Sequence, residues 1–229
     1  MREIVLDTET TGLDPQSGHR VVEIGAIEIY NKIKTGKFFH AYLNPERDMP
    51  DEAFKIHGIS TAFLKDKKKF AEIADEFLEF IADGQLVIHN ARFDLKFLNH
   101  ELSRVNKPLL NMANVVDTLD MARRKFPGSP ANLNALCKRF DINLSARDKH
   151  GALLDSELLV DVYLWLCGGL QPEMLERKSS GSQGTDITKL YEIARKGRSK
   201  RTFEPNQEDV ATHKEFLQKI KNPMWEKIS

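Results

Sequence analysis

The stretch that most constrains this chain is Ile4–Glu9, where three apolar residues run directly into two acids spaced two apart. Two of the apolar residues are β-branched, which is typical of a short buried strand. Side chains two apart on a strand point to the same side, so Asp7 and Glu9 can face one point. Neighbouring carboxylates repel unless a cation lies between them, and oxygen ligands suit Mg²⁺. The stretch predicts a metal-binding strand end, with an ordinary solvated strand end as the alternative.

Length and charge indicate one well-packed core with additional segments. The 229 residues include 34 Lys and Arg against 34 Asp and Glu, so net charge does not point to a polyanionic partner. Cys137 and Cys167 lie in apolar helical patterns without metal-ligand spacing, and we expect both to be reduced core thiols. With no signal peptide and no membrane span visible, the sequence predicts a cytoplasmic protein without a membrane anchor.

Apolar spacing predicts a β-meander followed by alternating helices and strands. The expected strands cover residues 4–6, 21–30, 37–43, 86–88 and 115–117, with a turn over 31–36. The expected helices cover residues 70–81, 95–105, 133–140 and 154–165. This order predicts an α/β fold with a mixed five-stranded sheet flanked by helices.

The composition changes near Leu170, where we place a domain boundary. A flexible basic linker is expected over residues 171–205, because it contains a Ser- and Gly-rich run and many Lys and Arg residues. A tail over residues 206–229 contains an amphipathic helix from about residue 208 to 221, opened by a capping-box pattern at Asn206 and Asp209.

Two further clusters of polar residues follow predicted elements. Asp94 comes just after the strand at 86–88 and opens a helix, where an ordinary first-turn acid is the alternative. Asp155 lies among leucines at the start of the closing helix and therefore needs a partner, either a metal or a nearby Arg or Lys. His150 lies in the loop five residues earlier, which makes it a candidate for catalysis although most loop histidines are surface residues.

These motifs together resemble those of the DEDDh 3′→5′ exonucleases, which have a ribonuclease-H-like fold. The matching residues are Asp7 and Glu9, then Asp94 in His-Asn-Ala-Arg-Phe-Asp, then His150 and Asp155 in His-Gly-Ala-Leu-Leu-Asp. The similarity extends over residues 1–169 and includes the segments 56–59, 117–119 and 132–137. Within the superfamily the chain is most similar to the proofreading subunits of bacterial DNA polymerase III.

The resemblance implies a site and a reaction. Two Mg²⁺ or Mn²⁺ ions are expected, with Asp7 bridging both, Glu9 and Asp155 completing the first, and Asp94 holding the second. His150 is expected to accept a proton from the attacking water, since its ordinary pKa suits a base at neutral pH. The products would be nucleoside 5′-monophosphates, released from a single-stranded or frayed 3′ end of DNA.

Substrate contacts are expected around these acids. Phe93 could stack on a base without regard to sequence, or it could pack in the core instead. Because a mismatched end unpairs more easily, selection can come from melting rather than base reading. The expected substrate-binding residues are Asp7, Glu9, Thr10, Thr11, Gly12, Leu13, His57, Asn90, Phe93 and Asp155.

The region after Leu170 is expected to bind partners. Phe216, Leu217 and Trp225 would contact the catalytic (alpha) subunit of polymerase III, as the resemblance implies. Gln171 and Leu175 would contact the sliding clamp, where a plain linker is the alternative. Two other possibilities for the tail are a DNA-holding basic segment and an end without a role.

Two other functions are possible for the chain. An RNA or small-oligonucleotide exonuclease would use the same five residues, and a non-catalytic polymerase-binding module could keep the fold. The intact set of five residues argues against the module. The segment after Leu170 favours proofreading, because a stand-alone trimming enzyme has no evident need of a tethered helix.

Overall fold

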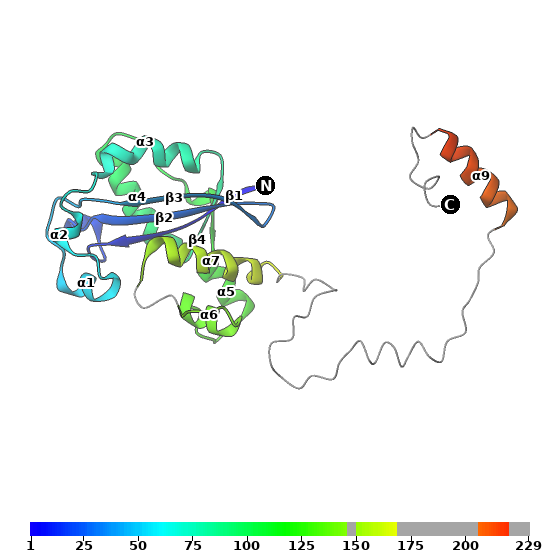
Figure 1. Ribbon diagram of the computed structural model, residues 1–229. Coiled ribbons are helices and arrows are strands. Elements are labelled where there is room, and N and C mark those ends of the chain that lie inside the picture. The colour runs from blue at the N-terminus through cyan, green and yellow to red at the C-terminus, as the bar shows by residue number, and fades with distance from the viewer. Residues whose placement is uncertain (146–149, 169–205, 220–229) are drawn as a thin grey trace. The chain divides into compact units, whose positions relative to one another are not determined.

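The computed structural model describes residues 1–145, 150–168 and 206–219 (Figure 1). The chain divides into two units, Met1–Met174 and Leu175–Ser229, and we describe each by itself. The expected ends of the linker, near residues 170 and 205, fall outside the described residues, so the three-part division stays a prediction.

The first unit is built on a five-stranded sheet in the order β3-β2-β1-β4-β5. Strands β1, β2 and β3 are antiparallel, whereas β4 and β5 run parallel to β1. The strand bounds are β1 Arg2–Thr10, β2 Val21–Tyr30, β3 Ile33–Tyr42, β4 Gln85–Ile88 and β5 Val115–Asp117. The mixed sheet and its opening meander confirm the expected fold class.

The turn between β2 and β3 is shorter than expected. Asn31 and Lys32 have φ values of 50° and 67°, so these two residues alone reverse the chain. Successive left-handed residues form the tight turns that match the twist of paired strands. Consequently β3 begins at Ile33 rather than Lys37, and the expected turn over 31–36 was too long.

Helices cover both faces of the sheet (Figure 1). Ile4 and Leu6 of β1 pack on the side of α3 and α4, whereas Val5 between them packs on the side of α5, α6 and α7. This alternation is the period of two that a strand buried on both faces requires. The helix bounds are α3 Phe70–Ile81, α4 Ala91–Arg104, α5 Thr118–Lys125, α6 Leu133–Arg139 and α7 Ala152–Leu166.

The sequence reading missed α5 and two other short helices, α1 Asp51–His57 and α2 Thr61–Leu64. A helix of one or two turns has too few apolar positions to show a period of 3.6. Its ends carry the better signal, since the Ser60 side chain accepts from the Phe63 amide at the start of α2. The short 3-10 turns η1 Pro15–Ser17 and η2 Met112–Asn114 complete the first unit as described.

One cysteine prediction is wrong. Cys137 is fully buried, but Cys167 is exposed, and neither residue forms a disulfide. Cys167 follows the last residue of α7, where the helix runs out of the core. An apolar pattern extended past the helix end therefore misplaced this residue.

In the second unit the structure describes α9, Gln207–Gln218, which confirms a helix close to the expected bounds. The Asn206 side chain accepts from the Glu208 amide and so caps the helix start. Among the described residues, no helix is both long and apolar enough to cross a membrane.

Candidate active site

The sheet brings the first two acidic clusters together at the end of β1. Because β4 runs parallel to β1, with Leu6 beside Ile88, both strands end at the same edge of the sheet. The turn after β4 leads directly into α4, which carries Asp94 in its first turn. Ligand-binding groups commonly gather at such an edge.

Thr8 fixes the Asp94 carboxylate. The Thr8 amide and hydroxyl donate to Asp94 Oδ1 over 3.1 and 2.7 Å. The start of α4 is held as well, because the Asp117 carboxylate accepts from the amides of Asn90 and Ala91 at 3.1 and 3.0 Å. Asn90 has a φ of 66°, which makes the sharp turn from strand to helix possible.

The third cluster reaches the site because α7 lies directly against β2 at Gly25. A Cβ at Gly25 would stand 2.3 Å from backbone atoms of Ala152 and Leu153, so only glycine admits this approach. The Ser156 hydroxyl also donates to the Gly25 carbonyl at 2.9 Å. This contact places the first turn of α7, with Asp155, beside the end of β1.

Glu9, His150 and Asp155 form a compact group of possible metal ligands. One ligand atom from each lies within 4.8 Å of the others. His150 Nδ1 lies 3.2 Å from Asp155 Oδ2, and the His150 side chain is 45% exposed while that of Asp155 is 4% exposed. The His150 amide also donates to the Ile56 carbonyl of α1 at 3.4 Å. The histidine therefore lies at the solvent edge of the site and the acid lies inside it.

The acids repel one another strongly. The pKa of Asp7 is raised well above its ordinary value, first by burial and then by the charges of Asp94, Glu9 and Asp155. Burial raises the pKa of Asp94 to about 7, although the Thr8 hydrogen bonds oppose the rise. A divalent cation would relieve this repulsion, and four carboxylates beside one imidazole suit a hard metal such as Mg²⁺ or Mn²⁺. The residues present therefore fit the expected metal.

The expected substrate-binding residues differ in their exposure. Thr10 and Thr11 are buried, and Thr10 donates to the Gly12 carbonyl at 2.6 Å. Leu13 is 81% exposed, which leaves its side chain open to a ligand. His57 is buried at the end of α1, where its Nδ1 accepts from the Ile59 amide.

Two substrate predictions depend on side chains at the start of α4. Asn90 is exposed and lies just before the helix. Phe93 is partly buried, packs against the core and contacts Phe97 with ring centroids 5.1 Å apart. Core packing, the alternative given above for Phe93, is thus observed, while stacking on a base stays a prediction.

Sequence reasoning missed three residues that shape the site. Thr8 orients Asp94, and Gly25 admits α7. Glu23 lies opposite Glu9 in the strand pair, is 2% exposed, and its Oε1 lies 2.8 Å from His40 Nε2. A signal for Glu23 existed, because an acid inside the apolar run of β2 requires a buried partner.

Partner residues can be described only in α9. Phe216 is 60% exposed and Leu217 is half-buried, both on the last turns of that helix. Gln171, Leu175 and Trp225 lie outside the described residues. Both the clamp contact and the whole polymerase contact stay predictions.

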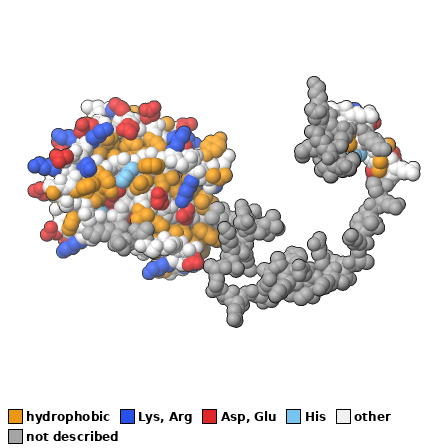
Figure 2. Space-filling view, viewed as in Figure 1, with side chains coloured by type: hydrophobic (Ala, Val, Ile, Leu, Met, Phe, Trp, Pro, Cys, Tyr) orange, Lys and Arg blue, Asp and Glu red, His pale blue; other side chains and the backbone are white. Residues whose placement is uncertain are grey.

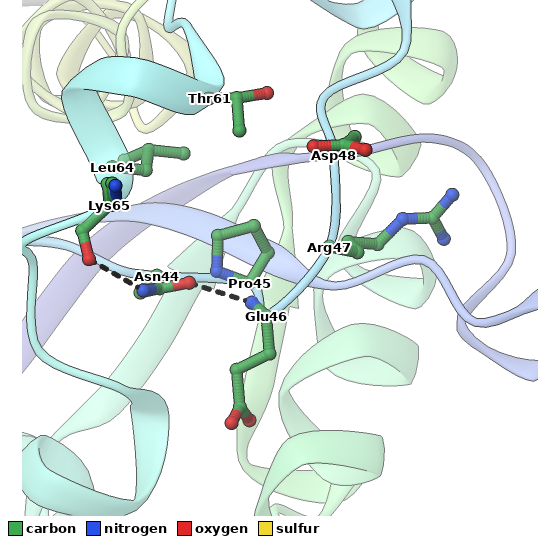
Figure 3. Close-up of a pocket in the computed structure, with 8 residues that line it drawn as sticks. All are labelled: Asn44, Pro45, Glu46, Arg47, Asp48, Thr61, Leu64 and Lys65. Carbon is green, nitrogen blue, oxygen red and sulfur yellow. Dashed lines mark hydrogen bonds between the residues drawn. The ribbon is translucent and has the colours of Figure 1, made fainter.

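A surface pocket of about 300 Å³ has none of Asp7, Glu9, Asp94 and Asp155 in its lining (Figure 3). Its lining is the polar segment after β3 and part of α2, namely Asn44, Pro45, Glu46, Arg47, Asp48, Thr61, Leu64 and Lys65. On the visible face of the first unit, acidic and basic side chains are interspersed with apolar ones (Figure 2). The arrangement of the acids identifies the site.

Comparison with known proteins agrees with this geometry. The exonuclease family model (RNase_T) matches residues 4–163. DNA polymerase III subunit epsilon of Rickettsia typhi (strain ATCC VR-144 / Wilmington) is 55% identical over 96% of this chain and 97% of its own length. The protein of the same name from Escherichia coli (strain K12) is 42% identical over 94% and 92%.

A solved structure shows the same fold. The nuclease domain of 3′hExo, a DEDDh family member bound to rAMP, has a TM-score of 0.61 at 16% identity, covering 73% of this chain and 92% of that one. The family model spans the sheet and all three acidic clusters. The chain therefore belongs to the exonuclease (RNase_T) family of 3′→5′ exonucleases and, within it, to the DNA polymerase III epsilon subunits.

Proposed function

We propose that this exonuclease removes nucleoside 5′-monophosphates from mismatched 3′ ends of DNA as the proofreading subunit of a DNA polymerase III holoenzyme in the cytoplasm. The observation that supports this most is the convergence of Asp7, Glu9, Asp94 and Asp155 with His150 at one strand end. The names of relatives at 42–55% identity support DNA as the substrate and a replicative polymerase as the partner.

Each acid has a proposed role in holding two Mg²⁺ or Mn²⁺ ions. Asp7 would bridge the pair, Glu9 and Asp155 would complete one site, and Asp94 would hold the other. When bound, such a pair stabilises the attacking and leaving oxygens of an in-line displacement. The pKa of Asp7 and of Asp94 is raised, so both residues must lose a proton before they can bind a cation well.

His150 is the proposed general base. Its side chain is partly exposed, so water can reach the ring. Asp155 Oδ2 lies 3.2 Å from Nδ1 and can orient the imidazole, which leaves proton acceptance to Nε2 in the matching tautomer. Gly151 and the contact at Gly25 set the start of α7 and so hold His150 near the acids.

Substrate and partner assignments extend the proposal beyond the site. Thr10, Thr11, Gly12 and Leu13 would contact the terminal nucleotide, with His57, Asn90 and Phe93 along the path of the strand. The tail, through Phe216, Leu217 and Trp225, would bind the alpha subunit, and Gln171 with Leu175 would bind the sliding clamp. The exposed aromatic ring of Phe216 on an amphipathic helix fits such an anchor.

One panel of substrates tests the proposal. Purified chain with Mg²⁺ is given labelled single-stranded DNA, matched duplex, duplex with a mismatched 3′ end, and RNA of the same sequence. Faster release of deoxynucleoside 5′-monophosphates from the single strand and the mismatched duplex is expected, and Asp7→Ala should abolish it. Faster cleavage of RNA would make the chain an RNA exonuclease, and near-normal turnover of Asp7→Ala would overturn the metal assignment.

A further inference from the structure

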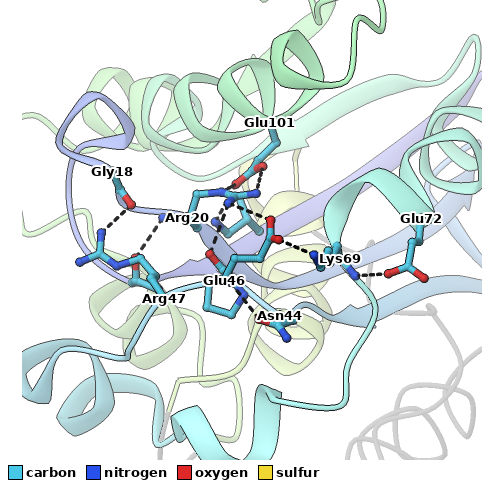
Figure 4. Close-up of polar contacts among 11 residues, drawn as sticks. Gly18, Arg20, Asn44, Glu46, Arg47, Lys69, Glu72 and Glu101 are labelled. Carbon is cyan, nitrogen blue, oxygen red and sulfur yellow. Dashed lines mark hydrogen bonds and ion pairs between the residues drawn. The ribbon is translucent and has the colours of Figure 1, made fainter.

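A buried ion pair connects the segment after β1 to the helix that carries Asp94. Arg20 donates through Nε and Nη2 to the two oxygens of Glu101 at 2.6 and 2.8 Å (Figure 4). The side chains are 9% and 2% exposed. Glu101 raises the pKa of Arg20, so the guanidinium stays charged. Two parallel hydrogen bonds fix orientation as well as distance, which a single contact does not.

The pair is hydrogen-bonded through the Arg20 backbone to Thr11, one of the proposed contacts with the terminal nucleotide. The Thr11 amide donates to the Arg20 carbonyl at 2.9 Å, and the Arg20 amide donates to Thr11 Oγ1 at 3.0 Å. The Val21 amide donates to Glu101 Oε1 at 3.4 Å. Movement of Glu101 would therefore be passed directly to Thr11.

The other end of the connection is the metal site. Asp94 and Glu101 are seven residues apart on α4 and so lie on one face, two turns from each other. Asp94 already accepts from Thr8 of β1. Strand β1 and the residues after it are thus tied to α4 at two points, one at the acids and one at Thr11.

A second set of contacts shields the pair from solvent. Arg20 Nη1 donates to the Pro45 carbonyl at 3.3 Å and lies 3.7 Å from Glu46 Oε2. Glu46 in turn forms an ion pair with Lys69, as Figure 4 shows. Arg47 donates to the Gly18 carbonyl and holds the same loop against the turn before Arg20.

Stability alone does not account for a pair of this kind. Apolar residues of similar volume stabilise a core as well as a buried ion pair does, or better, because burial of two charges is costly. What the guanidinium fork adds is a fixed geometry between two segments. We propose that Arg20 and Glu101 are positioning residues for exonuclease catalysis: they fix Thr11 and Gly12 relative to Asp94, and so place the 3′ end of the strand at the metal site.

This inference rests on the proposed function, because it needs the acids to hold metal and Thr11–Gly12 to meet the substrate. The test uses the full chain with Arg20→Met, Glu101→Leu and both together. Each single variant leaves a buried charge and should lower the melting temperature. The double variant should recover much of that loss, since no charge remains unpaired.

Kinetics then separate positioning from stability. For release of nucleotides from single-stranded DNA, kcat/KM of the double variant should stay at least about tenfold below that of the parent, since small misplacements cost rate. Arg20→Lys keeps the positive charge but lacks the two parallel donors of the guanidinium, so its kcat/KM should lie between those of the parent and the double variant. Binding in EDTA gives a second measurement. The parent should bind linear single-stranded DNA more tightly than circular single-stranded DNA, because a circle has no 3′ end, and the double variant should lose this difference in affinity.

A matched control exists at the opposite end of β1. Arg2 Nε lies 2.6 Å from Glu28 Oε2, and this pair joins the start of β1 to β2. Arg2→Met with Glu28→Leu should leave kcat/KM and the preference for linear DNA within about twofold of the parent, because it touches neither Thr11 nor α4.

Two outcomes would overturn the inference. If kcat/KM returns with melting temperature in the Arg20→Met, Glu101→Leu double variant, the pair only stabilises the fold. If the control variant Arg2→Met with Glu28→Leu lowers kcat/KM equally, loss of any buried ion pair impairs the enzyme, and Arg20 and Glu101 have no particular positioning role. Failure of the proposed function is distinguishable from both, because Asp7→Ala would then remain active.

Discussion

Thr8 Oγ1 lies 2.7 Å from Asp94 Oδ1, and the Thr8 amide donates to the same oxygen at 3.1 Å. Thr8 is the residue between the two acids of β1, and its side chain points away from theirs. The strand therefore presents Asp7 and Glu9 on one side and uses the residue between them to hold the third acid. Partners that orient a metal-binding carboxylate in this way commonly control its metal affinity.

Thr8→Val should lower metal affinity or turnover by about 10- to 100-fold, because it keeps the shape of the side chain and removes one donor to Asp94. Titration with Mn²⁺ and turnover on single-stranded DNA measure the effect. Thr8→Ser restores the hydroxyl and should recover most of the loss. If the valine variant equals the parent in both measurements, Thr8 does not orient Asp94.

Metal-free protein should become less stable as pH rises toward neutrality. The pKa of Asp94 is raised from 3.8 to about 7 in the folded chain, so the folded chain keeps this proton while the unfolded chain loses it. This contribution to stability is present below the ordinary pKa and is lost as pH rises through the folded pKa. Asp7 acts in the same direction.

The difference between variants isolates this effect. In EDTA, the melting temperature of Asp94→Asn should exceed that of the parent by a margin that grows between pH 5 and pH 8. In a chain of this size, each kcal/mol of difference in the free energy of unfolding corresponds to about 2–4 °C. Melting curves at several pH values supply the measurement. A margin that stays constant or shrinks with rising pH would contradict the raised pKa.

His150→Ala should lower turnover by roughly 10²–10⁴-fold, the usual contribution of a general base. Because His150 Nδ1 lies 3.2 Å from Asp155 Oδ2, the variant also tests whether the ring binds metal. Calorimetric titration with Mn²⁺ should show near-parental affinity in His150→Ala and weak affinity in Asp155→Ala. Equal losses of affinity would make His150 a ligand instead.

Gly25→Ala should displace the start of α7 and lower the free energy of unfolding by about 1–3 kcal/mol or more, as overpacking does. Its Cβ would meet helix backbone at 2.3 Å, which cannot rotate away as a flexible side chain can. Turnover should fall with it, because Asp155 moves. Gly128→Ala is the control, since only its φ of +75° opposes a side chain there. Parental turnover in Gly25→Ala would show that the contact is unimportant for the site.

A chain ending at Leu170 should keep exonuclease activity on single-stranded DNA and lose binding to the polymerase alpha subunit. The site lies within residues 7–155, and the exposed Phe216 lies in α9, in the second unit. Phe216→Ala with Trp225→Ala should reproduce the loss in a pull-down with purified alpha subunit. Strong salt dependence of the tail's effect on DNA binding would favour the basic segment as a DNA contact. Undiminished alpha binding by the shortened chain would place that contact on the first unit.

Local patterns in the sequence predicted much of the fold. The run from Val21 to Tyr30 is rich in apolar and β-branched residues, and β2 has those bounds. The helix at Phe70–Ile81 repeats apolar residues at helical spacing and has the expected bounds too. Short helices such as α2 were not predicted, because a single turn has too few apolar residues to show helical periodicity. The five motif residues identified the family, but their spacing in the sequence did not give the distances between their side chains in the folded chain.

The sequence by itself determined the strand order of the meander, the long helices, the five candidate active-site residues and the family. Only the tertiary structure decided what holds the site in place: Thr8 holds Asp94, Glu101 holds Arg20, and Gly25 holds the start of α7. These partners lie 86, 81 and 131 residues apart in the chain, counting Ser156 as the α7 partner of Gly25. Local periodicity reports which side of an element is buried. It does not report which distant side chain that element meets, because that depends on how the helices pack on the sheet.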